Sequence, residues 1–148
     1  MILTVATTFL LVAAALAIHF EILRLLFFEL PRLPFAGRLA GKHRVGVGVA
    51  GAMVAHGLEI VLFGLGFRLA LLVHPDGLVG GVHAAFDGSL WDCLYYAAVC
   101  YTSLGIGDIV PARPMQFMTG MTALTGLVLI SWTASFTFLL MQRYWRER

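Results

Sequence analysis

A short loop between two long apolar segments carries the residues with the most distinctive chemistry: from Thr102 to Asp108 the chain reads Thr-Ser-Leu-Gly-Ile-Gly-Asp. Its two glycines, Gly105 and Gly107, can adopt φ > 0 and so turn successive backbone carbonyl groups toward one side of the chain. A ring of such carbonyls, contributed by several copies of the chain, can replace the hydration shell of a cation. We therefore expect this loop to bind cations through backbone oxygens.

The composition places the loop in an integral membrane protein. Of 148 residues, 60% are hydrophobic and 12% are charged, and the mean hydropathy is +0.90. Soluble proteins have about 25% charged residues. A bilayer core of about 30 Å needs about 20 helical residues, and the chain has long apolar segments near 2–30, 45–73 and 115–141. The loop then lies at membrane depth, where irregular backbone is tolerated only if protein buries it or it lines water.

Charged residues outside the apolar segments predict the orientation. Basic residues gather between the first two segments and at the C-terminus: Arg32, Arg38, Lys42, Arg44, Arg143, Arg146 and Arg148. Acidic residues dominate between the second and third segments: Asp76, Asp87, Asp92 and Asp108. Because basic residues favour the cytoplasmic side, we expect a multi-pass cell-membrane protein with its N-terminus outside and its C-terminus in the cytoplasm. The first segment has no basic residue before it, so we expect a retained helix and not a secretory signal.

A fourth apolar stretch, residues 90–101, is too short to cross a bilayer. Ser89 is a suitable N-cap with Asp92 at the third helical position, so a helix should begin there. It should end near Tyr101, with its C-terminus directed into the membrane and toward the loop. The partial negative charge at that helix end would stabilise a cation at the bilayer centre.

These residues together resemble the tetrameric potassium channels that have a re-entrant pore loop. The family's filter, Thr-Thr-Val-Gly-Tyr-Gly-Asp, is similar to residues 102–108, and the Asp-x-x-Pro-x-x-Pro exit of some members is similar to residues 108–114. The resemblance covers roughly residues 45–142. It implies an all-α integral membrane fold with a re-entrant pore helix and a selectivity-filter loop, assembled as a homotetramer around a central pore. With the first segment, each chain has three transmembrane helices.

The resemblance also divides the chain into segments. They are an N-terminal transmembrane helix (1–30), a basic cytoplasmic linker (31–44), the pore module (45–142) and a basic cytoplasmic tail (143–148). Within the pore module we expect an outer helix (45–73), an outer loop (74–88), the pore helix (89–101), the filter (102–108) and the inner helix (115–142).

For the filter, the resemblance implies that potassium ions are held by backbone carbonyls and by one hydroxyl group. The filter residues are Thr102, Ser103, Leu104, Gly105, Ile106 and Gly107. The Ser103 side chain would supply the hydroxyl, and the Thr102 side chain would bond behind the filter. The resemblance implies metal ions only at these carbonyls, and no cofactor.

The resemblance also implies residues that support the filter. Tyr95 and Tyr96 stand where many members place an aromatic pair that braces the filter, and Asp108 is the filter acid. Ile106 replaces the family's tyrosine and has no hydroxyl for this pair, so we expect an apolar brace. Val99 stands where some members have a glutamate that pairs with the filter acid, so Asp108 is expected to bond water or backbone.

The inner helix is expected to line a cavity below the filter. If its spacing from the filter follows the family, the lining residues are Val128, Ser131, Ser135 and Leu139. Gly126 lies one residue before the family's usual hinge position, which predicts a bend there. The plainer interpretation of the hydroxyl residues on this helix is interhelical hydrogen bonding.

A set of polar residues in the apolar segments has no place in the resemblance. His56 and Glu59 lie one helical turn apart near the middle of the second segment, and a carboxyl at that depth marks a function or a specific partner. If the first helix runs antiparallel beside the second, His19 reaches the same depth and can bond Glu59. We expect an interhelical hydrogen-bonded cluster of these three residues; a proton-sensitive gating element and a metal site are the alternatives.

The predicted function is a homotetrameric, potassium-selective channel that lies in the lipid bilayer and conducts dehydrated monovalent cations. One alternative is a non-selective sodium and potassium channel, because Ile106 makes the filter less rigid. Another is a non-conducting membrane sensor or assembly subunit that works through His19, His56 and Glu59. No Ser/His/Asp or Cys/His set in the sequence indicates an enzyme, and no nucleic acid partner is expected.

Overall fold

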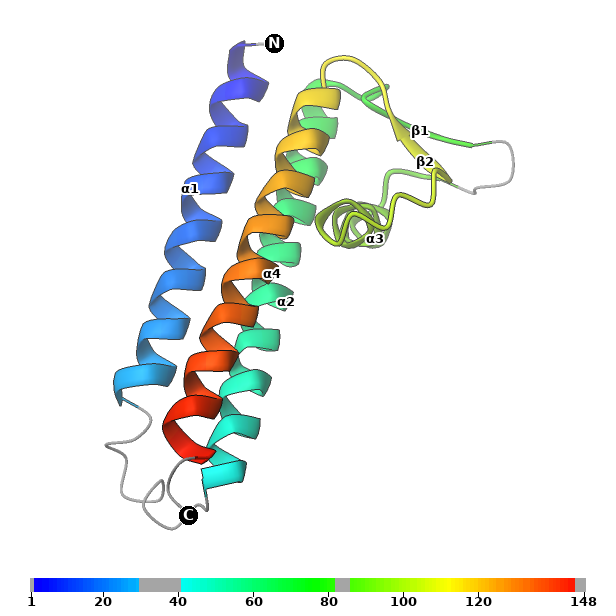
Figure 1. Ribbon diagram of the computed structural model, residues 1–148. Coiled ribbons are helices and arrows are strands. Elements are labelled where there is room, and N and C mark those ends of the chain that lie inside the picture. Colours follow the sequence, from blue (N-terminus) through cyan, green and yellow to red (C-terminus); the bar gives the residue numbers. More distant parts are fainter. Residues whose placement is uncertain (1, 30–40, 82–85, 146–148) are drawn as a thin grey trace.

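The structure, a computed structural model, describes residues 2–29, 41–81 and 86–145. Three long helices lie side by side in it (Figure 1): α1 (Ile2–Arg24), α2 (Gly41–Val73) and α4 (Gln116–Trp145). A π-helical segment, η1 (Leu25–Glu29), continues α1. All three helices are long and apolar enough to cross a membrane, which confirms the prediction of three transmembrane helices in an all-α membrane fold.

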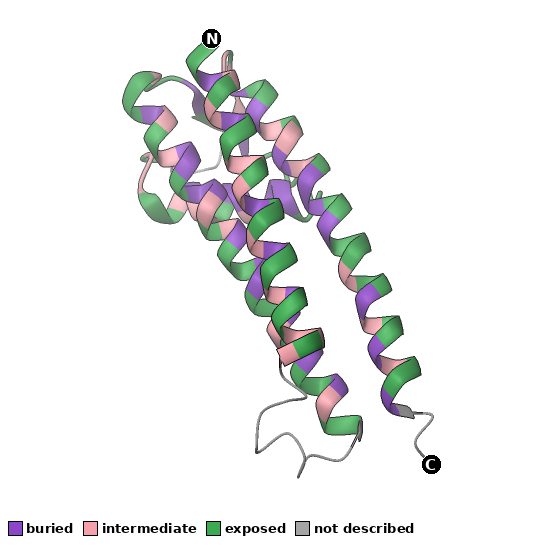
Figure 2. Cartoon of the chain, turned by 90° about the vertical axis from the view of Figure 1, so that its left-hand side faces the viewer, coloured by how far each residue is buried: buried purple, intermediate pink, exposed green. Residues whose placement is uncertain are grey.

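Small residues let the long helices approach one another closely. A Cβ at Gly51 of α2 would lie 2.6 Å from Cδ2 of Leu26 in η1, and a Cβ at Gly48 would overlap the Leu140 side chain of α4. The glycines at the start of α2 therefore pack against both neighbouring long helices, as a small-residue surface predicts. Figure 2 shows that the faces turned away from these contacts are exposed along the length of the helices, where lipid or further chains can cover them.

The short helix α3 (Leu90–Tyr101) packs against α2 and α4 (Figure 1). Its N-cap is Ser89, whose Oγ accepts a hydrogen bond from the Asp92 N–H at 3.2 Å, as the sequence predicts. The Asp92 carboxylate does not complete a capping box; it accepts instead from the Asp87 N–H at 2.9 Å. The Ser89 N–H donates to the Asp87 carboxylate at 2.8 Å, and this bond lowers the pKa of Asp87 from its ordinary value.

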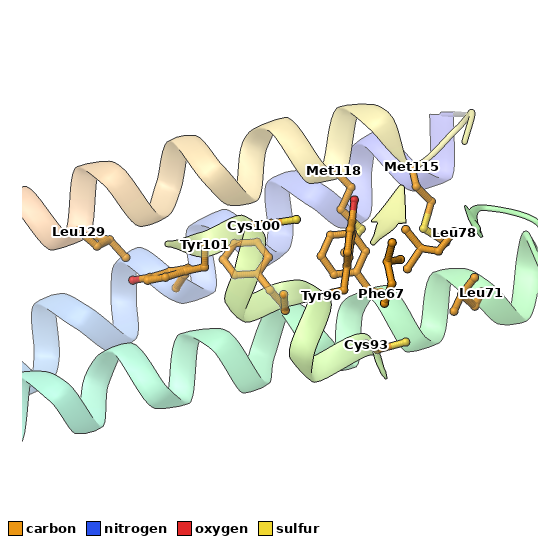
Figure 3. Packing of buried hydrophobic residues seen from close by; sticks show 14 residues of the cluster. Phe67, Leu71, Leu78, Cys93, Tyr96, Cys100, Tyr101, Met115, Met118 and Leu129 are labelled. Atoms are coloured by element: carbon orange, nitrogen blue, oxygen red, sulfur yellow. The ribbon is translucent and has the colours of Figure 1, made fainter. Parts of the chain in front are cut away.

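A buried cluster fixes α3 against its neighbours, and Figure 3 shows the side chains that α2, α3 and α4 contribute to it. The rings of Phe67 and Tyr96 meet edge to face, with centroids 4.9 Å apart. A Cβ at Gly64 of α2 would lie 3.0 Å from the Cα of Leu94, so the backbones of α2 and α3 approach each other closely at this point. Close packing of this kind holds the end of α3 at one position.

Two short strands that the sequence analysis did not predict connect the segments on either side of α3. β1 (Leu78–Gly80) pairs antiparallel with β2 (Ile109–Pro111). Three residues are too few to show the alternation that identifies a strand. The Gly81 N–H extends the pairing by donating to the Asp108 carbonyl at 2.7 Å. The end of the loop is thereby hydrogen-bonded to the segment that connects α2 with α3.

Two helix ends differ from the expected bounds. α2 begins at Gly41 and not at residue 45, and α4 ends at Trp145 and not at residue 142. The guanidinium groups of Arg44 and Arg143 lie over the ring of Tyr144, 5.3 and 5.5 Å from its centroid. Cation–π contacts of this kind stabilise the helices beyond their apolar segments. The rest of the expected linker and tail lies outside the described residues.

Candidate functional site

The loop that follows α3 has the backbone conformation that its glycine spacing predicts. Gly105 has φ +56° and Gly107 has φ +84°. Ser103 also has a positive φ, +57°, a conformation that few residues other than glycine adopt. Because every second residue from 103 to 107 has positive φ, the loop cannot continue the helix or pair as a strand.

The hydrogen-bond donors of the loop are held by the last turns of α3. The N–H groups of Ser103 and Leu104 donate to α3 carbonyls at 2.9 and 3.0 Å. Thr102 Oγ1 donates to another α3 carbonyl at 2.8 Å, so this side chain bonds behind the loop as expected. In the part of the chain that the structure describes, no carbonyl from residue 103 to residue 107 accepts a backbone hydrogen bond. The N–H groups of residues 102–105 are bonded to α3, and the carbonyl groups stay available to a ligand.

The two large apolar side chains of the loop are exposed in a single chain. Leu104 is 66% exposed and Ile106 is 56% exposed. Nothing lies within 4 Å of a Cβ built on Gly105 or Gly107. Exposed apolar side chains of this kind can be covered by lipid or by another chain. The expected cavity residues of α4 are exposed in the same way: Val128, Ser131, Ser135 and Leu139.

The inner helix passes close to the base of the loop. α4 continues without a break through Gly126. A Cβ at this position would overlap the Tyr101 carbonyl at the end of α3, so only glycine permits this approach. The structure therefore shows a packing role for Gly126, and the hinge there stays a prediction. Farther along α4, Ser135 and Leu139 line an apolar pocket of about 310 Å³ between α1 and α4.

The brace of the loop is polar, which corrects the expectation of an apolar one. The Tyr95 hydroxyl donates to Asp108 Oδ2 at 2.7 Å, and the Ile109 N–H donates to Asp108 Oδ1 at 3.0 Å. Tyr95 thus braces the acid and not the residue at the family's tyrosine position, a pairing that the sequence analysis did not consider. The hydroxyl of Tyr96 bonds Thr119 of α4 at 2.9 Å. One tyrosine holds the loop, and the other holds the inner helix.

A second group of polar side chains lies behind the loop, at the level where α3 ends. His19 from α1 and Glu59 from α2 are fully buried, and His19 Nδ1 lies 2.9 Å from Glu59 Oε1. His56 Nδ1 lies 3.2 Å from Glu59 Oε2. The structure thus brings together the three residues that the sequence analysis placed at one depth, with α1 antiparallel to α2.

Two members of this cluster were missed. Tyr101, the last residue of α3, donates its hydroxyl to Glu59, and its Oη lies 2.8 Å from His56 Nδ1. Thr133 of α4 places its Oγ1 2.9 Å from His56 Nε2 and 3.4 Å from His19 Nε2. Figure 3 shows the Tyr101 ring extending from the end of α3 beside Leu129. In a sequence, a tyrosine that ends an apolar helix resembles any core residue, so only its neighbours in space reveal this role.

The short helix α3 and the open loop come between the long apolar helices α2 and α4 in the chain, and α3 packs against both of them. The further long helix α1 lies beside α2 and α4. Residues 58–143 of the chain match a family model described as an ion channel. The chain belongs to this ion channel family. No curated protein and no solved structure matched the chain in the same comparisons.

The match covers more than half of the channel's chain, from the middle of α2 through α3 and the loop to the end of α4. It leaves out α1, which is an additional apolar helix at the N-terminus. The loop and its brace therefore lie wholly inside the family's domain. The polar cluster does not, because His19 comes from the additional helix and His56 precedes the matched residues, whereas Glu59, Tyr101 and Thr133 lie inside them.

Proposed function

We propose that the protein is a potassium-selective channel in which four copies of the loop from Thr102 to Gly107 form one selectivity filter. The observation that carries this proposal is the hydrogen bonding of the loop backbone: the N–H groups of residues 102–105 donate to α3, and the carbonyls of residues 103–107 accept no backbone hydrogen bond within the described chain. One loop cannot surround an ion, whereas four exposed loops can replace its hydration shell with carbonyl oxygens. The Thr-Ser-Leu-Gly-Ile-Gly-Asp sequence favours potassium through its likeness to potassium channel filters.

The orientation follows from charge. Acidic residues lie at the end of the molecule that holds the β-strands, and they would attract cations to the outer mouth. Basic residues lie at the opposite end, which would face the cytoplasm. The N-terminus of α1 is then outside and the C-terminus of α4 inside. In this orientation α3 enters from the outside, and the negative end of its dipole faces the ions.

Reconstitution tests this proposal. The purified protein in liposomes, with potassium on one side and sodium on the other, should carry a current that reverses close to the potassium equilibrium potential. Crosslinking in mild detergent should end at four subunits. A clean dimer, or a protein without current in either ion, would contradict the shared filter.

A non-selective sodium and potassium channel is the second candidate. The observation that favours it is the position of the brace. Tyr95 bonds Asp108, whereas Ile106 is 56% exposed and its side chain has no hydrogen-bonding group that a tyrosine could bond. A filter whose Ile106 has no polar brace would fit ions of different size less strictly. The same recording separates the two candidates. A channel equally permeable to both ions would give a reversal potential near zero when potassium and sodium are present at equal concentrations on opposite sides.

A further inference from the structure

We propose that His19, His56 and Glu59 form a binding site for a divalent transition metal ion, and that zinc fits their donor set best. One ligand atom from each of these residues lies within 4.8 Å of the others. Two imidazoles and one carboxylate are a common ligand set for zinc in proteins. The sequence alone favoured hydrogen bonds for these residues; the convergence of both histidines on one carboxylate points to a metal.

The distances suit a compact site. In a tetrahedral zinc site with bonds of about 2.0–2.1 Å, neighbouring ligand atoms lie about 3.3 Å apart. Glu59 Oε1 lies 2.9 Å from His19 Nδ1, and Glu59 Oε2 lies 3.2 Å from His56 Nδ1. The Tyr101 hydroxyl, 2.8 Å from His56 Nδ1, lies where a fourth ligand would be. Small movements of these side chains would therefore admit an ion among them.

A second shell for such a site is already present. Binding through Nδ1 requires each histidine to carry its proton on Nε2, and metal-bound histidines almost always donate that proton to a neighbouring oxygen. Thr133 Oγ1 lies 2.9 Å from Nε2 of His56 and 3.4 Å from Nε2 of His19. One hydroxyl oxygen thus faces both outer nitrogens. It would hold both rings in the tautomer that a metal needs.

Charge also favours an ion here. Glu59 is fully buried at the middle of a membrane-spanning helix, and an isolated carboxylate at that depth is costly. Between two neutral imidazoles it would carry an unbalanced negative charge. A divalent cation offsets that charge, and release of the Tyr101 hydroxyl proton to the solvent as its oxygen binds the ion would bring the site to neutrality. The His56 side chain is 11% exposed, so the site has one edge through which an ion can enter.

An ion at this place would join α1 to the channel domain. Its ligands come from α1 and α2, and Tyr101 is followed directly by Thr102 of the loop. Metal binding should therefore stabilise the docking of α1 in the assembled protein. Any effect on conduction rests on the proposed function, whereas metal binding does not.

The test uses the full-length protein in detergent, freed of metal with a chelator and dialysed. Titration with zinc should give one bound ion per chain, and cobalt at the same stoichiometry should give the intense visible absorption of a tetrahedral complex. His19→Gln, His56→Gln and Glu59→Gln should each weaken zinc binding at least about tenfold. His43→Gln is the matched control, because His43 is exposed near the start of α2 and should leave the titration unchanged.

Melting curves without metal separate binding from folding. Thr133→Val should keep the ligands and alter the cobalt spectrum, which a loss of fold would abolish. If the unaltered protein binds no zinc or cobalt, or if the three glutamine variants bind as well as the control, the site is a hydrogen-bonded cluster only and the proposal is wrong. Because binding is measured without a gradient, its failure leaves the liposome recordings, made with chelator present, as an independent test of the channel.

Discussion

The loop from Thr102 to Asp108 and the buried polar cluster meet at the end of α3, since Tyr101 belongs to the cluster and Thr102 begins the loop. Their chemistry is opposite in kind. The loop offers backbone carbonyls on an exposed surface, and its apolar side chains make no polar contact. The cluster offers side-chain nitrogens and oxygens in a buried space, and its backbone is ordinary helix. The function proposed for the loop depends on φ, whereas the metal site proposed in the cluster depends on the identity of each side chain.

This difference explains which substitutions the two regions can accept. Leu104 and Ile106 stand where the resembling potassium channels have valine and tyrosine, and the loop still keeps positive φ at both glycines. The cluster accepts fewer substitutions, because the single carboxylate of Glu59 is hydrogen-bonded to residues on three helices. Removing it takes one hydrogen bond from each of His19, His56 and Tyr101 and leaves His19 Nδ1 without a partner among the described residues.

The largest effect is expected at a loop glycine. Gly105→Ala adds a Cβ at φ +56°, where side chains are disfavoured, although nothing in the single chain would touch that Cβ. We expect the variant to assemble and to lose selective potassium conduction. Reversal potentials and flux in liposomes measure the loss.

A glycine outside the loop provides the control. Gly57 lies on an exposed face of α2, and nothing lies within 4 Å of a Cβ built there. Gly57→Ala should conduct normally, because alanine suits a helix better than glycine. Normal potassium flux in Gly105→Ala would remove the carbonyl mechanism.

In the cluster, a double-mutant cycle measures the coupling between α1 and α2. Glu59→Leu removes one hydrogen bond from each of His19, His56 and Tyr101 and leaves His19 Nδ1 unpaired, at about 1–3 kcal/mol for an unpaired neutral group. His19→Leu leaves a buried carboxylate with one partner fewer, and breaking a buried pair in this way costs about 3–5 kcal/mol. The double variant should lose less stability than the two single losses together. Melting of the assembled protein in detergent gives the three values, and simple additivity would show that the two residues are not coupled.

The same contrast explains how much the sequence could predict. The positive φ at Gly105 and Gly107 is a local property, so the spacing of the glycines was sufficient. The depth of His19 against Glu59 followed from helical rise and an antiparallel arrangement. The rotation of each helix about its axis could not be derived, and this rotation brings Tyr101 and Thr133 into the cluster. The strands and the bond from Tyr95 to Asp108 depend on the path of the loop, which no short-range pattern encodes.

A substitution at the contact of the two regions should disturb both. Gly126→Ala would drive a Cβ into the Tyr101 carbonyl, and backbone cannot move aside as a side chain can. Overpacking of this kind costs about 1–3 kcal/mol. We expect lower melting of the assembled protein together with reduced potassium flux. Gly46→Ala, where nothing lies within 4 Å, should change neither; a stable Gly126→Ala protein with normal flux would mean that α4 does not touch α3 here.

The smallest effect is expected at the polar brace, because its hydrogen bond is open to water. Tyr95→Phe removes the donor at 2.7 Å from Asp108 Oδ2 and keeps the ring, so the loss should be about 0.5–1.5 kcal/mol. Asp108 retains the Ile109 N–H, and the loop should still form. Sustained potassium flux should therefore fall by less than about tenfold, since tenfold corresponds to about 1.4 kcal/mol.

Tyr96→Phe is the control that distinguishes loss of the bond between Tyr95 and Asp108 from a general weakening of the packing of α3. This variant loses the hydroxyl that bonds Thr119 at 2.9 Å, on the face directed to α4. It should lower the melting temperature of the assembled protein and leave the flux per assembled channel unchanged, because it makes no contact with the acid of the loop. Tyr95→Phe should show the reverse: near-normal melting with reduced sustained flux. If both variants change the same quantity by the same amount, the two tyrosines act only as packing for α3, and the bond to Asp108 has no part in holding the loop.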